Sequence, residues 1–182
     1  MPAERTVKQR PLRQLTLTGA NTSFSSSPSS LKSTSKISKK SKSSIDRVYT
    51  DTILTIKPKF AELISKREKN HEFRKYELRE SVERLWLYET APVSAITYVM
   101  DTARPKRPGE VQDSSGIGND DFDNGLKESK FGYPVLGLYK LEKPLKAVDM
   151  KSLYGISPPQ GYLYAPKKLV EEVKTEEMNK LF

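Results

Sequence analysis

The chain has 182 residues and a formal net charge of +9, with 32 Lys and Arg against 23 Asp and Glu. It has no cysteine and one histidine, which excludes disulfides, cysteine nucleophiles and thiolate metal sites, so we expect no metal and no cofactor. No apolar run approaches the roughly 20 residues that span a bilayer. The first 20 residues also lack the apolar core of a secretory signal. We therefore expect no membrane partner and a nuclear or cytoplasmic location.

The first 50 residues hold most of the net positive charge. Residues 1–50 contain ten Lys and Arg and two Asp and Glu, whereas the remaining residues contain 22 and 21. Residues 21–44 are rich in Ser and Lys, and their few apolar residues follow no period, so they bury too little surface to offset the entropy of ordering. We predict a disordered basic arm over residues 1–46. It would attract phosphates, signal nuclear import, dock a protein partner, or serve only as a solvated linker.

The pattern changes after residue 50. Thr52–Ile56 is a short β-rich run, and Pro58 then suits the first turn of a helix. Apolar residues at positions 60, 63 and 64 predict an amphipathic helix of about eight residues. A polar segment ends this helix, and His71–Arg74 is predicted to be the second strand.

The rest of the chain alternates short strands with polar connections. A long polar segment over 102–130 is predicted to be a functional loop, a small helical insert or disorder. We expect the last residues, 174–182, to fray or to extend the final helix. The other predicted elements are strands at Arg84–Glu89, Val93–Met100 and Pro134–Leu141, and helices at Asp149–Leu153 and Pro166–Val173.

Several short strands with one early helix predict an α+β fold, in the form of a small, mixed, partly closed β-barrel with short flanking helices. A purely parallel α/β sheet would need longer helices between its strands. We place the folded domain at residues 47–174 and a C-terminal tail at 175–182.

Three charged residues stand close together around the second strand. Lys69, Glu72 and Arg74 fall within six residues, and Glu72 and Arg74 are two positions apart, so their side chains share one face of a strand. Phe73 points to the opposite face. A strand with one charged and one apolar face lies between a cleft and a core, which makes this segment the leading candidate for a functional site.

Residues 53–99 resemble the ASCH domain, a PUA-like β-barrel. The family signature is Gly-x-Lys-x-x-Glu-x-Arg after an Ile-Lys-Pro start, and it is matched here by Lys69, Glu72 and Arg74 after Ile56-Lys57-Pro58. The segment Ala91-Pro92-Val93 resembles the family's later turn. Arg67 stands where the family has Gly, so we expect a different turn before the strand.

The resemblance implies a cleft beside the early helix, with Lys57, Lys69, Glu72 and Arg74 as ligand-binding residues. Arg and Lys bind phosphate or base acceptors, and a carboxylate accepts from an exocyclic amino group. Trp86 and Tyr88 are secondary candidates for stacking on an unpaired base, and packing in the core is the alternative for both. Only one face of their strand can line the cleft. We therefore expect either Trp86 and Tyr88 or Leu85 and Leu87 to point outward.

Three functions follow from these features. The first is a nucleic-acid-binding module, with RNA as the expected partner, in which the cleft reads a base and the arm adds nonspecific affinity. The second is an amidohydrolase of acetylated cytidine nucleosides, known from one branch of the family, with Lys69 and Glu72 as its catalytic residues. In that branch a Thr stands where this chain has Glu72. The third is a protein-interaction adaptor, in which the cleft is vestigial and the arm and the 102–130 loop dock partners. The alternative for the motif itself is that Glu72 forms only a surface ion pair with Arg74 or Lys69.

Overall fold

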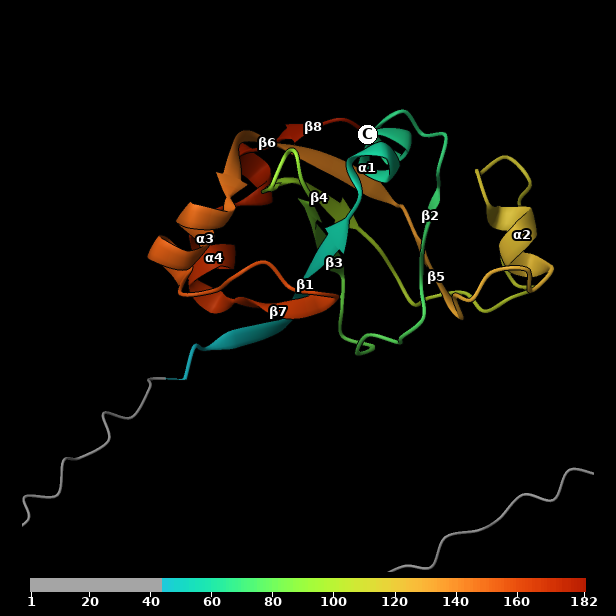
Figure 1. Cartoon of the computed structure of the whole chain (residues 1–182), viewed down its shortest axis with the longest axis horizontal. Coiled ribbons are helices and arrows are strands. Elements are labelled where there is room, and N and C mark those ends of the chain that lie inside the picture. Colours follow the sequence, from blue (N-terminus) through green and yellow to red (C-terminus); the bar gives the residue numbers. More distant parts are fainter. Residues whose placement is uncertain (1–43) are drawn as a thin grey trace, which may run out of the picture. The chain divides into compact units, whose positions relative to one another are not determined.

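The computed structural model describes residues 44–182, which form eight strands and four short α-helices (Figure 1). The strands are β1 (Arg47–Ile56), β2 (His71–Arg74), β3 (Arg84–Glu89), β4 (Ala95–Asp101), β5 (Phe131–Pro134), β6 (Gly137–Lys146), β7 (Tyr162–Pro166) and β8 (Asn179–Lys180). The helices are α1 (Pro58–Ser65), α2 (Asn119–Asp123), α3 (Ala147–Tyr154) and α4 (Lys167–Glu172), and a 3-10 turn covers Thr175–Glu177. The predicted α+β class is confirmed.

Six strands form the main sheet in the order β7-β1-β3-β4-β6-β8, and β2 pairs with β5 in a second, two-stranded sheet. β1 and β3 are parallel and the other neighbours are antiparallel, so the main sheet is mixed. The described pairings do not join the two sheets into one closed ladder, so closure into a barrel stays a prediction. No helix in the described part of the chain is long and apolar enough to cross a bilayer.

Helix α1 forms as predicted, with eight residues that begin at Pro58. It connects the parallel strands β1 and β3 by way of β2, and it buries Ala61 and Ile64 against the sheet. Because β3 is central in the sheet and has a helical layer on each side, both of its faces are buried. The expectation that one face of β3 points outward is therefore wrong.

The two faces of β3 enter different parts of the core. Leu85 and Leu87 pack on the α1 side, with the residues of β1 that alternate toward that helix. Trp86 and Tyr88 pack on the other side, with side chains from α3 and α4. They are 1% and 7% exposed.

Other differences from the predicted elements come from pairings between distant residues. The predicted strand at 134–141 is divided, because β5 joins the second sheet and β6 joins the main one. The tail does not extend a helix. Its β8 pairs with Tyr139 and Lys140 on the free edge of β6, and the Leu181 amide donates a hydrogen bond to the Leu138 carbonyl. Backbone N–H and C=O groups of the tail are thus hydrogen-bonded to the sheet edge, whereas in a helix they would be hydrogen-bonded to one another.

Tyr133 attaches the small sheet to the core. It lies opposite Glu72 in the β2–β5 pair and is 2% exposed. Its hydroxyl accepts a hydrogen bond from the Leu78 amide at 2.7 Å and donates to the Tyr76 carbonyl at 3.4 Å. Burial raises the pKa of Tyr133 to about 12, so the hydroxyl stays protonated at neutral pH.

Asp51 is the most connected buried carboxylate near the start of the sheet. It is fully buried and accepts two hydrogen bonds from Arg84, at 2.7 and 3.0 Å, and one from the Trp86 indole at 2.9 Å. The Thr50 hydroxyl also donates to it at 2.7 Å. The parallel β1–β3 pairing therefore includes a bidentate ion pair at Asp51 and Arg84, which are direct partners in the strand register.

We expect Asp51→Asn to lower the free energy of unfolding by roughly 3 kcal/mol, because it leaves the Arg84 guanidinium partly buried without a countercharge. Urea denaturation followed by circular dichroism measures this loss. Asp120→Asn, at an exposed position of α2, is the matched control and should leave the urea midpoint in place. Equal midpoints for the two variants would show that the Asp51 charge contributes nothing.

Candidate functional site

The end of α1 places the motif lysine. The Arg67 residue, which stands at the family's glycine position, has φ of 61°, in the left-handed region that glycine occupies most easily. The amides of Glu68 and Lys69 both donate to the Leu63 carbonyl, which closes the helix. Arg67 thus has a left-handed backbone although it is not glycine, and the turn directs Lys69 back toward β2.

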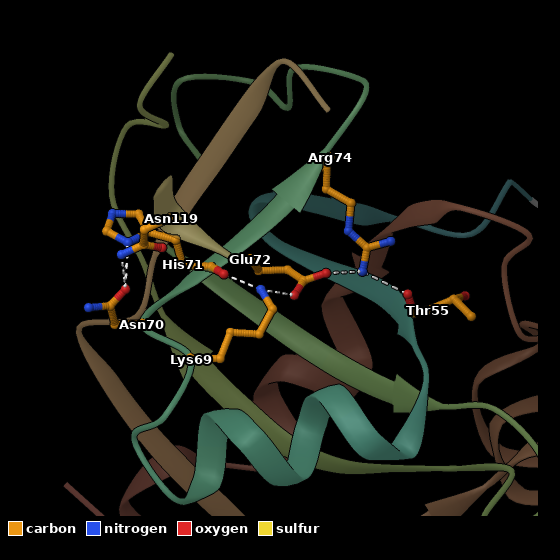
Figure 2. Close-up of polar contacts among 7 residues, drawn as sticks. All are labelled: Thr55, Lys69, Asn70, His71, Glu72, Arg74 and Asn119. Atoms are coloured by element: carbon orange, nitrogen blue, oxygen red, sulfur yellow. Dashed lines mark hydrogen bonds and ion pairs between the residues drawn. The ribbon is translucent and has the colours of Figure 1, made fainter. Parts of the chain in front are cut away.

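Lys69, Glu72 and Arg74 form one ion network (Figure 2). The Glu72 Oε2 atom lies 2.8 Å from the Lys69 Nζ atom, and Glu72 Oε1 lies 2.8 Å from the Arg74 guanidinium. Arg74 also donates to the Thr55 carbonyl of β1 at 2.8 Å, and Lys69 donates to the His71 carbonyl. The network therefore links the small sheet to the main one.

Burial sets the electrostatics of this network. Lys69 and Glu72 are 6% and 5% exposed, so little water reaches either charge. Burial lowers the pKa of Lys69, and the attraction of Glu72 offsets part of that effect. The Lys69 ammonium engages Glu72 Oε2, whereas the buried Arg74 Nε has no hydrogen-bond partner among the described residues.

His71 lies on the opposite face of β2, among amide side chains (Figure 2). Its Nδ1 atom is 2.9 Å from the Asn70 side-chain oxygen, which also accepts a hydrogen bond from Asn119 at 2.8 Å. Burial lowers the pKa of His71, and the nearby Lys69 charge adds to this shift. The imidazole is therefore neutral at physiological pH. Its partner Asn70 joins this end of β2 to the 102–130 segment, through hydrogen bonds with Asp113 and Asn119.

A groove of about 470 Å³ lies beside the network. The Phe73 ring lies in it and stacks on Phe122 of α2, with 4.6 Å between ring centroids. The Lys69 ammonium lies 4.6 Å from the Phe73 centroid, and the Lys127 ammonium lies 5.4 Å from it. The lining residues are Phe60, Lys69, Glu72, Phe73, Lys75, Ile117, Gly118, Asp121, Lys127, Glu128 and Ser129.

The structure brings together three of the predicted site residues. Lys69 and Glu72 line the groove, and Arg74 holds Glu72 from the other side. Lys57 is exposed at the start of α1, and no side-chain contact connects it to the network. Trp86 and Tyr88 pack on the far side of β3, away from α1 and the groove, so they do not reach a base bound there.

Sequence reasoning missed the groove residues Phe73, Ile117 and Lys127. Because Phe73 alternates with Glu72 along the strand, the sequence predicts that its ring points to the core. In the structure the ring stacks on Phe122 of α2 and lines the groove. Residues 117 and 127 come from the long polar segment, in which no local pattern marks a ligand site. Among the described residues, no group of three or more His, Cys, Asp or Glu side chains is arranged to hold a metal ion.

No family model matches the sequence, and no curated protein does so either. Three crystal structures match the fold, all of the ASCH protein of Zymomonas mobilis. The unsubstituted protein has a TM-score of 0.53 at 16% identity, over 72% of this chain and 98% of that one. This chain has the ASCH-domain fold. A tyrosine-to-phenylalanine variant gives 0.52 at 15%, over 71% and 99%, and a serine-to-alanine variant gives 0.50 at 18%, over 70% and 99%.

The ASCH fold is thus confirmed by structure, as the motif residues predicted. At identities this low, the likeness concerns the backbone, and it does not transfer a ligand or a reaction. The groove and its ion network must therefore be judged by their own chemistry.

We expect Glu72→Gln to lower the free energy of unfolding by about 3–5 kcal/mol, because it leaves the Lys69 and Arg74 charges without their shared carboxylate. The pKa of Lys69 should fall further in this variant. The unfolded chain then binds a proton that the folded chain does not, so stability should rise more steeply with pH than in the wild type, up to about pH 10. Urea midpoints across this range measure the slope.

Glu62→Gln is the control for this experiment, because Glu62 pairs with Lys66 on the exposed side of α1. It should leave both the midpoint and its pH dependence close to those of the wild type. A Glu72→Gln variant that behaves like this control would show that the network does not hold the two sheets together.

Proposed function

We propose that the domain binds single-stranded RNA and holds one base in the groove on the Phe73 ring. The observation that carries this proposal is an aromatic ring in a groove of about 470 Å³, with two lysine ammonium groups over the ring. A base stacks on such a ring whatever its sequence. The Lys69 ammonium and the Glu72 carboxylate, at the inner wall, then supply a donor and an acceptor for the base edge.

The groove suits a base better than a phosphate because its charges are balanced. Each of its three lysines has a carboxylate beside it, so the groove has little net positive potential. These pairs are Lys69 with Glu72 at 2.8 Å, Lys127 with Asp121 at 3.7 Å, and Lys75 with Glu128.

We propose that the backbone of the RNA is attracted by the basic arm, residues 1–46, of which all but the last three lie outside the described residues. Its excess of Lys and Arg would release counterions from RNA and make overall affinity salt-dependent. In this arrangement the arm supplies affinity and the folded ASCH domain supplies discrimination. The protein would then act in the nucleus or the cytoplasm, where RNA is present.

Phe73→Leu should weaken binding of a short single-stranded RNA by roughly tenfold, because leucine keeps the apolar contact with Phe122 but offers no stacking face. Fluorescence anisotropy with the full chain measures the Kd. The salt dependence of binding should stay unchanged, since the substitution removes no charge.

Phe131→Leu is the matched control, at another half-buried phenylalanine of the same two-stranded sheet but outside the groove. Its Kd should equal that of the wild type. Equal affinities for Phe73→Leu and the wild type would exclude the groove as the base site, whatever the arm contributes.

The lowered pKa of Lys69 favours a second candidate, the amidohydrolase of acetylated cytidine. A buried lysine with a raised fraction of free amine, 2.8 Å from a carboxylate, has the features of an activated nucleophile or base. Glu72 would move the proton. The departure from the hydrolase pattern at Glu72 makes this the weaker of the two proposals.

If this second function is correct, the purified full chain should convert N4-acetylcytidine to cytidine and acetate, and Lys69→Met should abolish the conversion. Chromatography of the reaction mixture measures the product. Intact N4-acetylcytidine after prolonged incubation with the wild-type chain would remove the amidohydrolase proposal and leave RNA binding unaffected.

A further inference from the structure

A row of four tyrosines lies along the β7 edge of the main sheet. The Tyr49 and Tyr164 rings meet edge to face at 5.1 Å, Tyr164 and Tyr162 do so at 5.7 Å, and Tyr162 and Tyr76 lie 4.7 Å apart. We call Tyr49, Tyr164, Tyr162 and Tyr76 the tyrosine row. Its members come from β1, from β7 and from the connection between β2 and β3, so the tertiary fold alone assembles it.

Two rings of the tyrosine row are exposed to solvent. Tyr49 is 45% exposed and Tyr162 is 37% exposed, although large aromatic side chains gain most when they are fully buried. β7 is the outermost strand on this side of the sheet. A line of accessible ring surfaces at a sheet edge matches the platforms on which proteins stack unpaired bases.

A cation, Arg79, lies on the tyrosine row. The Arg79 guanidinium is 3.9 Å from the Tyr49 ring centroid and 5.5 Å from that of Tyr164. The two carboxylates that flank Arg79 most closely in this loop are already paired. Glu77 lies 3.5 Å from Arg107, and Glu80 lies 3.1 Å from Arg104. Arg79 therefore remains available to a phosphate or to the face of a base.

The inner end of the tyrosine row holds polar atoms without partners. Among the described residues, the buried Tyr76 hydroxyl and the buried Arg74 Nε have no hydrogen bond. Arg74 is the end of the ion network opposite to Lys69, and Lys69 lines the Phe73 groove. The tyrosine row therefore ends beside the same ion network that lines the groove.

We propose that the tyrosine row is a second stacking surface for single-stranded nucleic acid, which holds bases next to the one bound in the groove. The proposal rests on the proposed RNA-binding function and extends it from one base to several. A proline-rich peptide also docks on exposed tyrosines, but it offers no anion to Arg79 and nothing with which to stack on the guanidinium plane. Nucleic acid supplies both.

The test measures the Kd of the full chain for a single-stranded oligouridine by fluorescence anisotropy. Tyr162→Leu and Tyr49→Leu should each weaken binding by about fivefold or more, and Tyr162→Phe should bind as the wild type does, because it keeps the ring. Tyr139→Leu is the matched control, at a half-buried tyrosine of β6 outside the row. It should leave the Kd unchanged.

A second measurement needs no substitution. Photo-crosslinking of the wild-type chain to 4-thiouridine RNA, followed by mass spectrometry, should give crosslinked peptides that contain Tyr49 or Tyr162. This result would separate a contact with RNA from an effect of the leucine variants on folding.

The outcomes distinguish the two proposals. If Phe73→Leu weakens binding while both row variants bind normally and no row peptide is crosslinked, the tyrosine row is not an RNA surface and the groove proposal stands. If the row variants weaken binding and Phe73→Leu does not, the row binds RNA and the groove is not the base site. A polyproline peptide whose binding depends on Tyr162, with RNA affinity unchanged, would replace nucleic acid by a peptide partner.

Discussion

The Glu72 carboxylate is the interaction on which the arrangement of this domain depends. One of its oxygens faces Lys69, the other faces Arg74, and Arg74 continues to the Thr55 carbonyl of β1. This chain of contacts crosses from the two-stranded sheet to the six-stranded one. Because the carboxylate and the ammonium are both more than nine-tenths buried, each charge is tolerated only while the other is present.

The segment at 102–130 turns this charged junction into a groove. The Asp123 carboxylate accepts hydrogen bonds from the backbone amides of Gly109, Val111 and Gln112, which folds the segment around α2. Asn119 is fully buried and donates to Asn70, immediately before β2. The segment is therefore fixed to the same strand that carries the motif, and its own residues form one wall of the groove.

The net positive charge and the groove lie in different parts of this protein. The first 50 residues hold almost all of the net positive charge, whereas the lysines of the groove are each paired with a carboxylate. An unbalanced charge attracts any polyanion at long range, and a balanced groove with an aromatic surface discriminates at short range. The tyrosine row adds ring surface on the other side of the ion network, with Arg79 as its cation.

Much of the local structure could be predicted from the sequence. The helix after Pro58 and the strands at His71–Arg74 and Arg84–Glu89 were expected at these bounds, because their periodicity and flanking residues are local signals. The partnership of Lys69, Glu72 and Arg74 was expected as well, since short spacing on one strand brings these side chains together. The predicted ligand-binding role of Lys57 has no support, because its side chain is exposed and makes no contact with the ion network.

The sequence by itself determined the α+β class, the ASCH resemblance and the charged motif, all of which depend on residues close together in the chain. Only the tertiary structure decided that both faces of β3 are buried, that Phe73 meets Phe122, and that four tyrosines form one row. These features join segments separated by tens of residues. No local pattern specifies such contacts, because they are set by which surfaces pack together once the strands have found their neighbours.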